Sequence, residues 1–291
     1  MIGTVLTILA PTLICVALGF GWARLKQSYD TRLIARLITL VGGPCLIFTT
    51  LLRTTVDLAA LGEVALIALI ALAIFALTAL AILRATRLSI PAYLPPLTFH
   101  NAGNLGLPIS LFAFGETGLA IAIAYFTVTA TLNYTLGTWF YSGRASPVDA
   151  LKTPLPYAVA IAVPLLLLDA RPPEWLLNTT GLLGQMTIPL MLFTLGVSLT
   201  RLKLTNLPRH TVLAALRLGL GFGVGFGLAE LFGLEGVARG VVILQASMPV
   251  AVFNYLLAQH FDRYSDEAAS IVLTSTLLAV ISLPLILWYL L

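Results

Sequence analysis

Long apolar runs follow one another along almost the whole chain, and no other feature of the sequence constrains the fold as strongly. A helix needs about 20 mostly apolar residues to cross the hydrocarbon core of a bilayer. Only 10% of the 291 residues are charged, against about a quarter in soluble domains. We therefore predict an all-α polytopic membrane protein with ten transmembrane helices, at residues 4–22, 33–52, 61–83, 91–114, 117–141, 154–169, 180–200, 208–230, 236–259 and 267–290.

The linkers between these spans differ in charge. Those after the first, third, fifth, seventh and ninth spans contain Arg24, Lys26, Arg32, Arg36, Arg84, Arg87, Arg144, Lys152, Arg201, Lys203, Arg209 and Arg263. The others contain only Arg53, Arg171 and Arg239. Because cytoplasmic loops carry the excess of lysine and arginine, we expect a multi-pass protein of the plasma membrane, the inner membrane of a bacterium, with both termini outside. The same bias explains the formal net charge of +4 without a nucleic-acid partner.

The spans divide into two groups of five, and an odd number of spans gives the two groups opposite orientations. The first half, the second half and the cytoplasmic linker between them are residues 1–141, 154–291 and 142–153. Similar stretches occupy corresponding spans. P-x-x-x-F-T begins at Pro44 and at Pro189, and P-x-x-x-F begins at Pro108 and at Pro249. These matches indicate two inverted five-helix repeats.

The fourth span contains two amides, two glycines and a proline within nine residues, from His100 to Pro108. Irregular backbone at membrane depth is tolerated only where protein or water covers it, and interrupted spans point to the binding sites of transporters. Pro108 and Pro249 each remove a backbone donor, so we predict that the fourth and ninth helices break there and cross at the midplane. Gly103 and Gly106 belong to the same crossover.

The two broken spans run in opposite directions, so the N-terminal ends of their second halves converge. The partial positive charge of each helix end favours an anion. The polar side chains nearby complete a candidate substrate site, which comprises Asn101, Asn104, Gln245, Ser247 and Asn254. Alternatively, these side chains satisfy only the backbone groups that the breaks release.

Two ionisable side chains extend this candidate site. Arg217 lies about 12 Å inside the eighth span at 1.5 Å per residue, and a buried arginine is usually functional. It attracts the substrate anion or balances a carboxylate, unless it snorkels to the membrane surface. His100 is a possible proton relay, although a hydrogen-bonded structural histidine fits the sequence equally well.

Signatures of soluble enzymes are missing from the sequence. There is no P-loop, GxSxG or HExxH motif, and Cys15 and Cys45 lie inside apolar spans, outside any metal-ligand pattern. We therefore expect no enzymatic activity, no cofactor and no metal. Without a Walker motif, uphill transport requires an ion gradient or the membrane potential, and both H+ and Na+ stay open as coupling ions.

Three stretches, HNAGNLGLPIS at 100–110, ASMPVAVFNYLLAQHF at 246–261 and DEAASIVLTSTLLAVISLP at 266–284, resemble the auxin efflux carrier family of plant PIN carriers and bacterial PIN-like transporters. The resemblance implies a fold shared with bile acid sodium symporters. It implies a transport domain of spans 3–5 and 8–10 that moves against a scaffold of spans 1, 2, 6 and 7, as in an elevator. It also implies a homodimer.

The resemblance suggests roles for individual residues. Asn101 corresponds to a substrate contact of the plant carriers, and Thr49 and Thr194 are possible lining residues of the scaffold. The acid-rich sodium sites of the bile acid branch have no clear match here.

Together these observations predict a secondary transporter or uniporter of small organic anions, such as auxin-like or dicarboxylic acids, that works by alternating access. A sodium-coupled carrier like the bile acid symporters and a transport-inactive sensor on the same fold are the alternatives.

Overall fold

The computed structural model describes residues 2–143 and 154–291, and within these ranges the secondary structure is helical, without a β-strand. Most of the predicted linker at 142–153 therefore lies outside the described residues. Seven helical stretches of the described chain are long and apolar enough to cross a membrane, namely Ile2–Arg24, Thr31–Arg53, Leu58–Ala85, Ala102–Ser142, Glu174–Leu199, Leu207–Leu231 and Ser265–Leu290. The prediction of an all-α membrane protein with several spans is confirmed.

The first half of the chain contains α1 (Ile2–Arg24), α2 (Thr31–Leu37), η1 (Ile38–Gly42), α3 (Gly43–Arg53), α4 (Leu58–Ala85), α5 (Ile90–Thr98), η2 (Ala102–Gly106), α6 (Leu107–Leu132), η3 (Asn133–Gly137) and α7 (Thr138–Ser142). The second half contains α9 (Leu155–Leu167), α10 (Glu174–Gln185), α11 (Thr187–Leu199), α12 (Leu207–Leu231), α13 (Gly236–Ala246), α14 (Val252–His260) and α15 (Ser265–Leu290). The elements η1, η2 and η3 are single π-helical turns.

One glycine divides the longest helical stretch. Gly115 has φ 66° and ψ −160° inside α6, a conformation that favours glycine because it has no Cβ atom. The helical segment before Gly115 belongs to the predicted fourth span and the segment after it to the predicted fifth span, whose expected limits were residues 114 and 117. The 41-residue stretch Ala102–Ser142 is therefore two helical segments.

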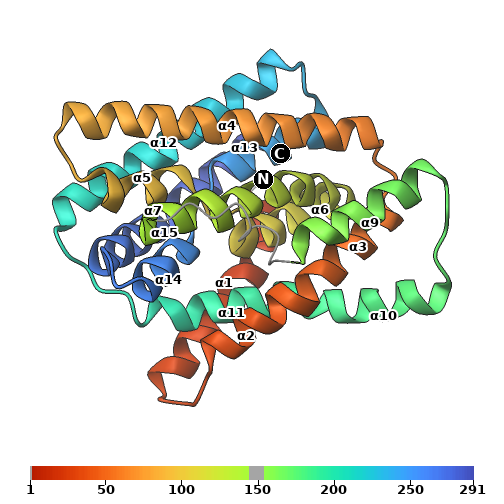
Figure 1. The fold of residues 1–291 in the computed structure, drawn as a ribbon, viewed down its shortest axis with the longest axis horizontal. Coiled ribbons are helices and arrows are strands. Elements are labelled where there is room, and N and C mark those ends of the chain that lie inside the picture. Colours follow the sequence, from red (N-terminus) through yellow and green to blue (C-terminus); the bar gives the residue numbers. More distant parts are fainter. Residues whose placement is uncertain (1, 144–153) are drawn as a thin grey trace.

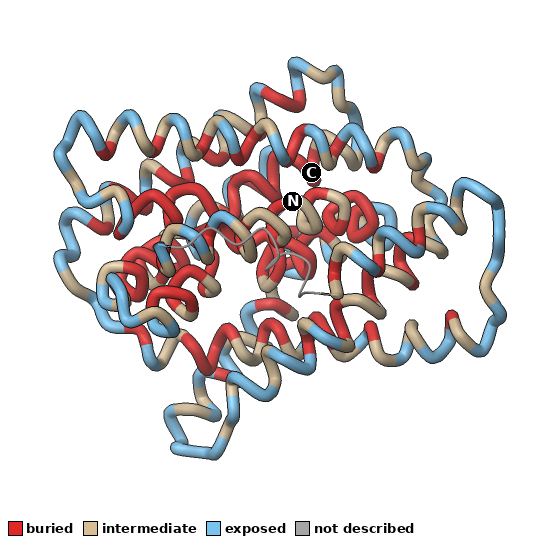
Figure 2. The backbone as a smooth tube through the Cα atoms, in the orientation of Figure 1, coloured by how far each residue is buried: buried red, intermediate tan, exposed pale blue. Residues whose placement is uncertain are grey.

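The helices enclose a buried centre (Figure 1). In that view α4 follows one edge of the molecule, α10 and α11 follow the opposite edge, and α6 and α13 lie between them. Figure 2 shows buried residues concentrated in the middle and exposed residues along the outer faces. Many exposed side chains are large and apolar, including Leu77, Leu182 and Ile281, as a protein surrounded by lipid requires.

The glycines of α12 fall on two different faces. A Cβ atom on Gly221 would contact the Ala246 carbonyl oxygen and lie 3.1 Å from Ser247 Cα, and one on Gly225 would lie 2.8 Å from Ala246 Cβ. By contrast, a Cβ on Gly219 or Gly223 would have no neighbour within 4 Å. Close packing of α12 on α13 therefore depends on two of these glycines only.

Candidate functional site

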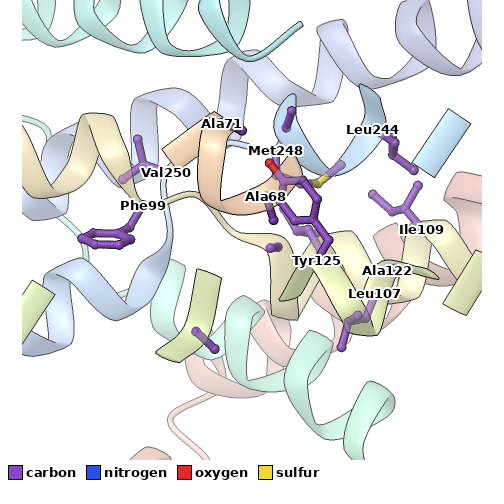
Figure 3. Close-up of a cluster of buried hydrophobic side chains, with 14 of the residues drawn as sticks. Ala68, Ala71, Phe99, Leu107, Ile109, Ala122, Tyr125, Leu244, Met248 and Val250 are labelled. Carbon is purple, nitrogen blue, oxygen red and sulfur yellow. The ribbon is translucent and has the colours of Figure 1, made fainter. Parts of the chain in front are cut away.

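Two helical segments are interrupted at the same place in the buried centre. The chain leaves helical geometry between α5 and η2 and again between α13 and α14, and the two interruptions meet in an antiparallel bridge between His100 and Val250. The Asn101 N–H donates to the Pro249 carbonyl oxygen at 2.7 Å, and the Ala251 N–H donates to the Phe99 carbonyl oxygen at 3.1 Å. Figure 3 shows Phe99 and Val250 beside each other at this crossing.

Polar side chains complete the hydrogen bonding of the interrupted backbone. Asn254 Nδ2 donates to the Phe99 carbonyl oxygen at 3.0 Å, and the Val250 N–H donates to Ser275 Oγ at 3.1 Å. Asn101 Oδ1 accepts the Asn104 N–H at 3.2 Å and so caps the start of η2. Because an unpaired backbone group is costly in an apolar environment, these side chains stabilise the crossing.

The position of the first interruption corrects the prediction from the sequence. Pro108 lies in the first turn of α6, where a proline needs no N–H partner, and the helix is interrupted at Phe99–Asn101 instead. Gly103 and Gly106 lie in η2, one turn beyond that point. Pro249 does lie within the second interruption. The P-x-x-x-F matches at Pro108 and Pro249 are therefore not structurally equivalent, since the bridge pairs His100 with Val250.

A cavity of about 510 Å³ lies against the crossing, within the size range of small-molecule sites. From the crossing it is lined by His100, Asn101, Gly103, Asn104 and Phe253. From the opposite wall it is lined by residues of α2, η1, α3 and α11, including Thr39, Leu46, Met191, Thr194 and Ser198. The lining reaches Arg36 on α2 and Ser198 near the C-terminal end of α11.

The cavity lining contains one cationic side chain and is otherwise mostly apolar. Arg36 at its exposed rim is the one arginine or lysine among the lining residues that the structure describes, and no carboxylate occurs among them. The N-terminal ends of η2 and α14, at Asn101 and Ala251, also face this space. Helix N-termini carry a partial positive charge, so both ends add positive electrostatic potential to this space.

Several buried polar atoms of the lining residues have no hydrogen-bond partner within the described part of the protein. They are Asn101 Nδ2, Asn133 Oδ1 and Thr187 Oγ1. The His100 ring contacts Phe75 and Tyr125 edge-on, with centroids 5.7 Å away in each case. Atoms of this kind are available to a bound ligand or to water.

Five of the residues predicted to bind substrate do not line the cavity: Thr49, Arg217, Gln245, Ser247 and Asn254. Thr49 Oγ1 bonds Thr180 Oγ1 at 2.7 Å, and Ser247 Oγ donates to the Ile243 carbonyl oxygen at 2.6 Å. Gln245 is fully buried, with Nε2 3.4 Å from Ser110 Oγ. Of these three and Asn254, only Ser247 and Asn254 donate to backbone carbonyl oxygens, as the structural alternative describes. The crossing places His100, Asn101 and Asn104 in the cavity lining, and Thr194 faces them from α11 on the opposite wall.

Arg217 does not snorkel. Its side chain is 0% exposed, Nη2 donates to the Ala246 carbonyl oxygen at 3.1 Å, and Cζ lies 4.3 Å from the centroid of the Phe75 ring. The described chain places no carboxylate beside it, because the buried polar residues include no aspartate or glutamate.

Sequence reasoning missed Arg36, Asn133 and Tyr134 as lining residues. Arg36 belongs to the predicted loop charges, and nothing in its sequence context distinguishes it from Arg32. Asn133 offered a signal, since an amide inside an apolar span is unusual, and it begins the π-helical turn η3. The Tyr134 ring packs against Phe253, with centroids 4.6 Å apart.

Comparisons with known proteins agree with this architecture. A family model described as "Membrane transport protein" matches residues 142–287, which include Arg217 and the α13–α14 interruption. An uncharacterized transporter of Methanothermobacter thermautotrophicus is 28% identical over 272 residues, covering 88% of each chain. One of Methanocaldococcus jannaschii is 27% identical over 201 residues, 66% of this chain and 65% of that protein. The chain therefore belongs to the membrane transport protein family, whose members resemble the auxin efflux carriers.

Proposed function

We propose that this membrane transporter is a secondary carrier or uniporter of small organic anions. The observation that carries the proposal is the cavity at the crossing, where two helix N-termini and Arg36 supply positive potential and no described lining residue is acidic. Electrostatic complementarity of this kind selects the sign of the ligand charge. Asn101, with an unpartnered Nδ2, would donate a hydrogen bond to the anion.

The remaining walls suggest which anions fit. Most lining residues are apolar, among them Leu46, Leu107, Phe126, Met191 and Phe253. An apolar wall with a few polar groups binds a ligand that has an apolar body and one charged end. We therefore favour monocarboxylates with an aryl or alkyl body over small dicarboxylates.

We also propose that the helical segments form ten spans in two inverted repeats. Gly42 and Thr187 precede Pro44 and Pro189 by two residues each, and a Cβ atom on Gly42 would meet Thr187 Oγ1. Equivalent residues that lie next to each other are expected near a two-fold axis in the membrane plane. The paired hydrogen bonds on either side of the His100–Val250 bridge support the same axis.

The arrangement supports alternating access by an elevator motion. Spans 3–5 and 8–10 would carry the crossing past a scaffold of spans 1, 2, 6 and 7, which supplies the opposite wall of the cavity. With the basic loops in the cytoplasm and both termini outside, the cavity opens inward in this conformation. Assembly as a homodimer is a further proposal that rests on the family resemblance.

Uptake of carboxylates into proteoliposomes tests the function. Removing a hydrogen bond to a charged ligand costs about 1.5–3 kcal/mol, so Asn101→Ala should lower uptake by about 10- to 100-fold. Arg36→Gln should weaken apparent affinity by about two- to fivefold, as for an exposed charge. Arg32→Gln, a neighbouring arginine on α2 outside the cavity lining, is the matched control and should behave as wild type.

Wild-type uptake in both Asn101→Ala and Arg36→Gln would contradict the proposal. Purified protein that binds carboxylates without any flux would favour the sensor alternative. A strict requirement of wild-type uptake for sodium would favour the alternative of a carrier like the bile acid symporters.

A further inference from the structure

The largest fully buried side chain among the described residues belongs to Arg217, and it lies just behind the cavity. The guanidinium carbon is 4.3 Å from the Phe75 ring centroid, and the His100 ring centroid is 5.7 Å from the same point. The two distances place the charge no more than about 10 Å from the His100 ring, which lines the cavity. Over that range, a unit charge alters the affinity for a second charge about tenfold in a protein interior.

The guanidinium lies at a particular end of an interrupted helix. Its hydrogen bond goes to the carbonyl oxygen of Ala246, the last residue of α13. The C-terminal end of a helix carries a partial negative charge. In transporters with discontinuous helices, such ends and the adjoining unwound carbonyls are the places where coupling cations bind.

The surroundings of Arg217 stabilise its positive charge without a neighbouring carboxylate. The face of the Phe75 ring stabilises the guanidinium through its π electrons. Gly221, one turn along α12, leaves the space through which the guanidinium reaches Ala246, since a Cβ there would lie 2.7 Å from Nη1. Nε and Nη1 have no hydrogen-bond partner within the described chain, so the charge is only partly compensated.

The corresponding end of α5 is treated differently. The carbonyl oxygen of Phe99, the residue after α5, receives the neutral amide of Asn254 and the Ala251 N–H. The bridge makes this carbonyl the counterpart of the Pro249 carbonyl, which accepts the Asn101 N–H. Among the described residues no arginine or lysine side chain donates to a carbonyl oxygen of α5 (Ile90–Thr98), where the counterpart of Ala246 lies. The two halves of the crossing therefore share a backbone arrangement but differ in charge.

We propose that Arg217 is a tethered cation that takes the place of a mobile coupling cation at the C-terminal end of α13. It is a positioning residue, which holds this half-helix in place. It also makes the electrostatic potential of the cavity more positive, whether or not a mobile cation is present. The inference rests on the proposed transport of organic anions and deepens it, because it makes sodium unnecessary for substrate binding.

Three variants separate charge from packing and hydrogen bonding. Arg217→Lys keeps a positive charge, Arg217→Gln keeps a hydrogen-bond donor without charge, and Arg217→Ala removes both. We measure carboxylate affinity by thermal shift and uptake by proteoliposomes, each in sodium buffer and in choline buffer. We expect the lysine variant to stay close to wild type and the glutamine variant to lose about tenfold in affinity.

Sodium provides the second readout. We expect wild-type binding to be the same in sodium and choline, and Arg217→Ala to bind more tightly in sodium, because the vacated helix end becomes open to a mobile cation. A glutamine variant that binds as tightly as the lysine variant would overturn the proposal, and so would sodium dependence of the wild type.

The failure of the proposed function has a different signature. If the wild type neither binds nor transports any carboxylate, the transport proposal fails. The melting temperatures of the Arg217→Lys and Arg217→Gln proteins still test whether the end of α13 needs a positive charge. If it does, the glutamine variant should be less stable than the lysine variant.

Discussion

Replacing Gly221 by alanine should destabilise the protein, whereas the same replacement two residues away should stabilise it. Both positions lie inside α12, so the intrinsic effect of the substitution is the same. Alanine is favoured over glycine in a helix by about 0.8–1.0 kcal/mol. Gly223 is exposed, and a Cβ atom there has no neighbour within 4 Å, so Gly223→Ala should gain about 1 kcal/mol.

At Gly221 the new methyl group meets backbone instead of open space. It would contact the Ala246 carbonyl oxygen and lie 3.1 Å from Ser247 Cα. Backbone cannot rotate away as a side chain can, so α12 and α13 must separate. Overpacking of this kind costs about 1–3 kcal/mol, which offsets the helix-propensity gain and leaves a net loss of up to about 2 kcal/mol. The two variants should then differ by about 1–3 kcal/mol.

Thermal unfolding of the purified protein in detergent measures this difference directly. A shift of about 2–4 °C per kcal/mol, as in large domains, makes it resolvable. We expect Gly223→Ala to melt above wild type and Gly221→Ala below Gly223→Ala, with carboxylate uptake reduced in Gly221→Ala only. Equal melting temperatures for the two variants would show that α12 does not pack on α13 through Gly221, and the reasoning would be refuted.

Two further changes test other contacts. Asn254→Ala leaves the Phe99 carbonyl oxygen without its side-chain donor and should cost about 1–3 kcal/mol, read as a lower melting temperature; Gln259→Ala, exposed on the same helix, should have no such effect. In the loop between α1 and α2, burial raises the pKa of Tyr29 above 10.0, against the opposing effect of its hydrogen bond to Thr194. The stability that depends on the neutral phenol is lost as the pH rises through this raised pKa. Above about pH 10, the melting temperature of wild type should therefore fall more steeply with pH than that of Tyr29→Phe. The same dependence of melting temperature on pH in both proteins would contradict this.

The helical segments were predictable because the bilayer imposes strong rules on sequence. Predicted limits at residues 4–22 and 208–230 correspond to α1 (Ile2–Arg24) and α12 (Leu207–Leu231). The predicted boundary between the fourth and fifth spans coincides with Gly115, where the helix is interrupted. In each case apolar runs of the required length alternate with short polar linkers, so local composition is sufficient.

The interruption between α5 and η2 was expected in the correct segment but at the wrong residue. The sequence favours a break at proline, because proline lacks an N–H group. The helix is instead interrupted where a partner exists for the released groups, since Asn101 and Phe99 pair with Pro249 and Ala251. That partner comes from a segment about 150 residues away, which no local pattern reveals.

Residue types in the sequence were enough to indicate a membrane protein and a transporter with an interrupted polar segment, and they place the predicted anion site near Asn101. These follow from hydrophobic length, charge distribution and polar residues placed in lipid, all of which are local properties. Only the tertiary structure decided which polar residues face the cavity and which hold the backbone. Asn101 and Asn254 are the same residue type at the same crossing, yet one lines the cavity and the other donates to Phe99. The difference arises because a side chain's role depends on which segments pack around it, and packing is set by the whole chain.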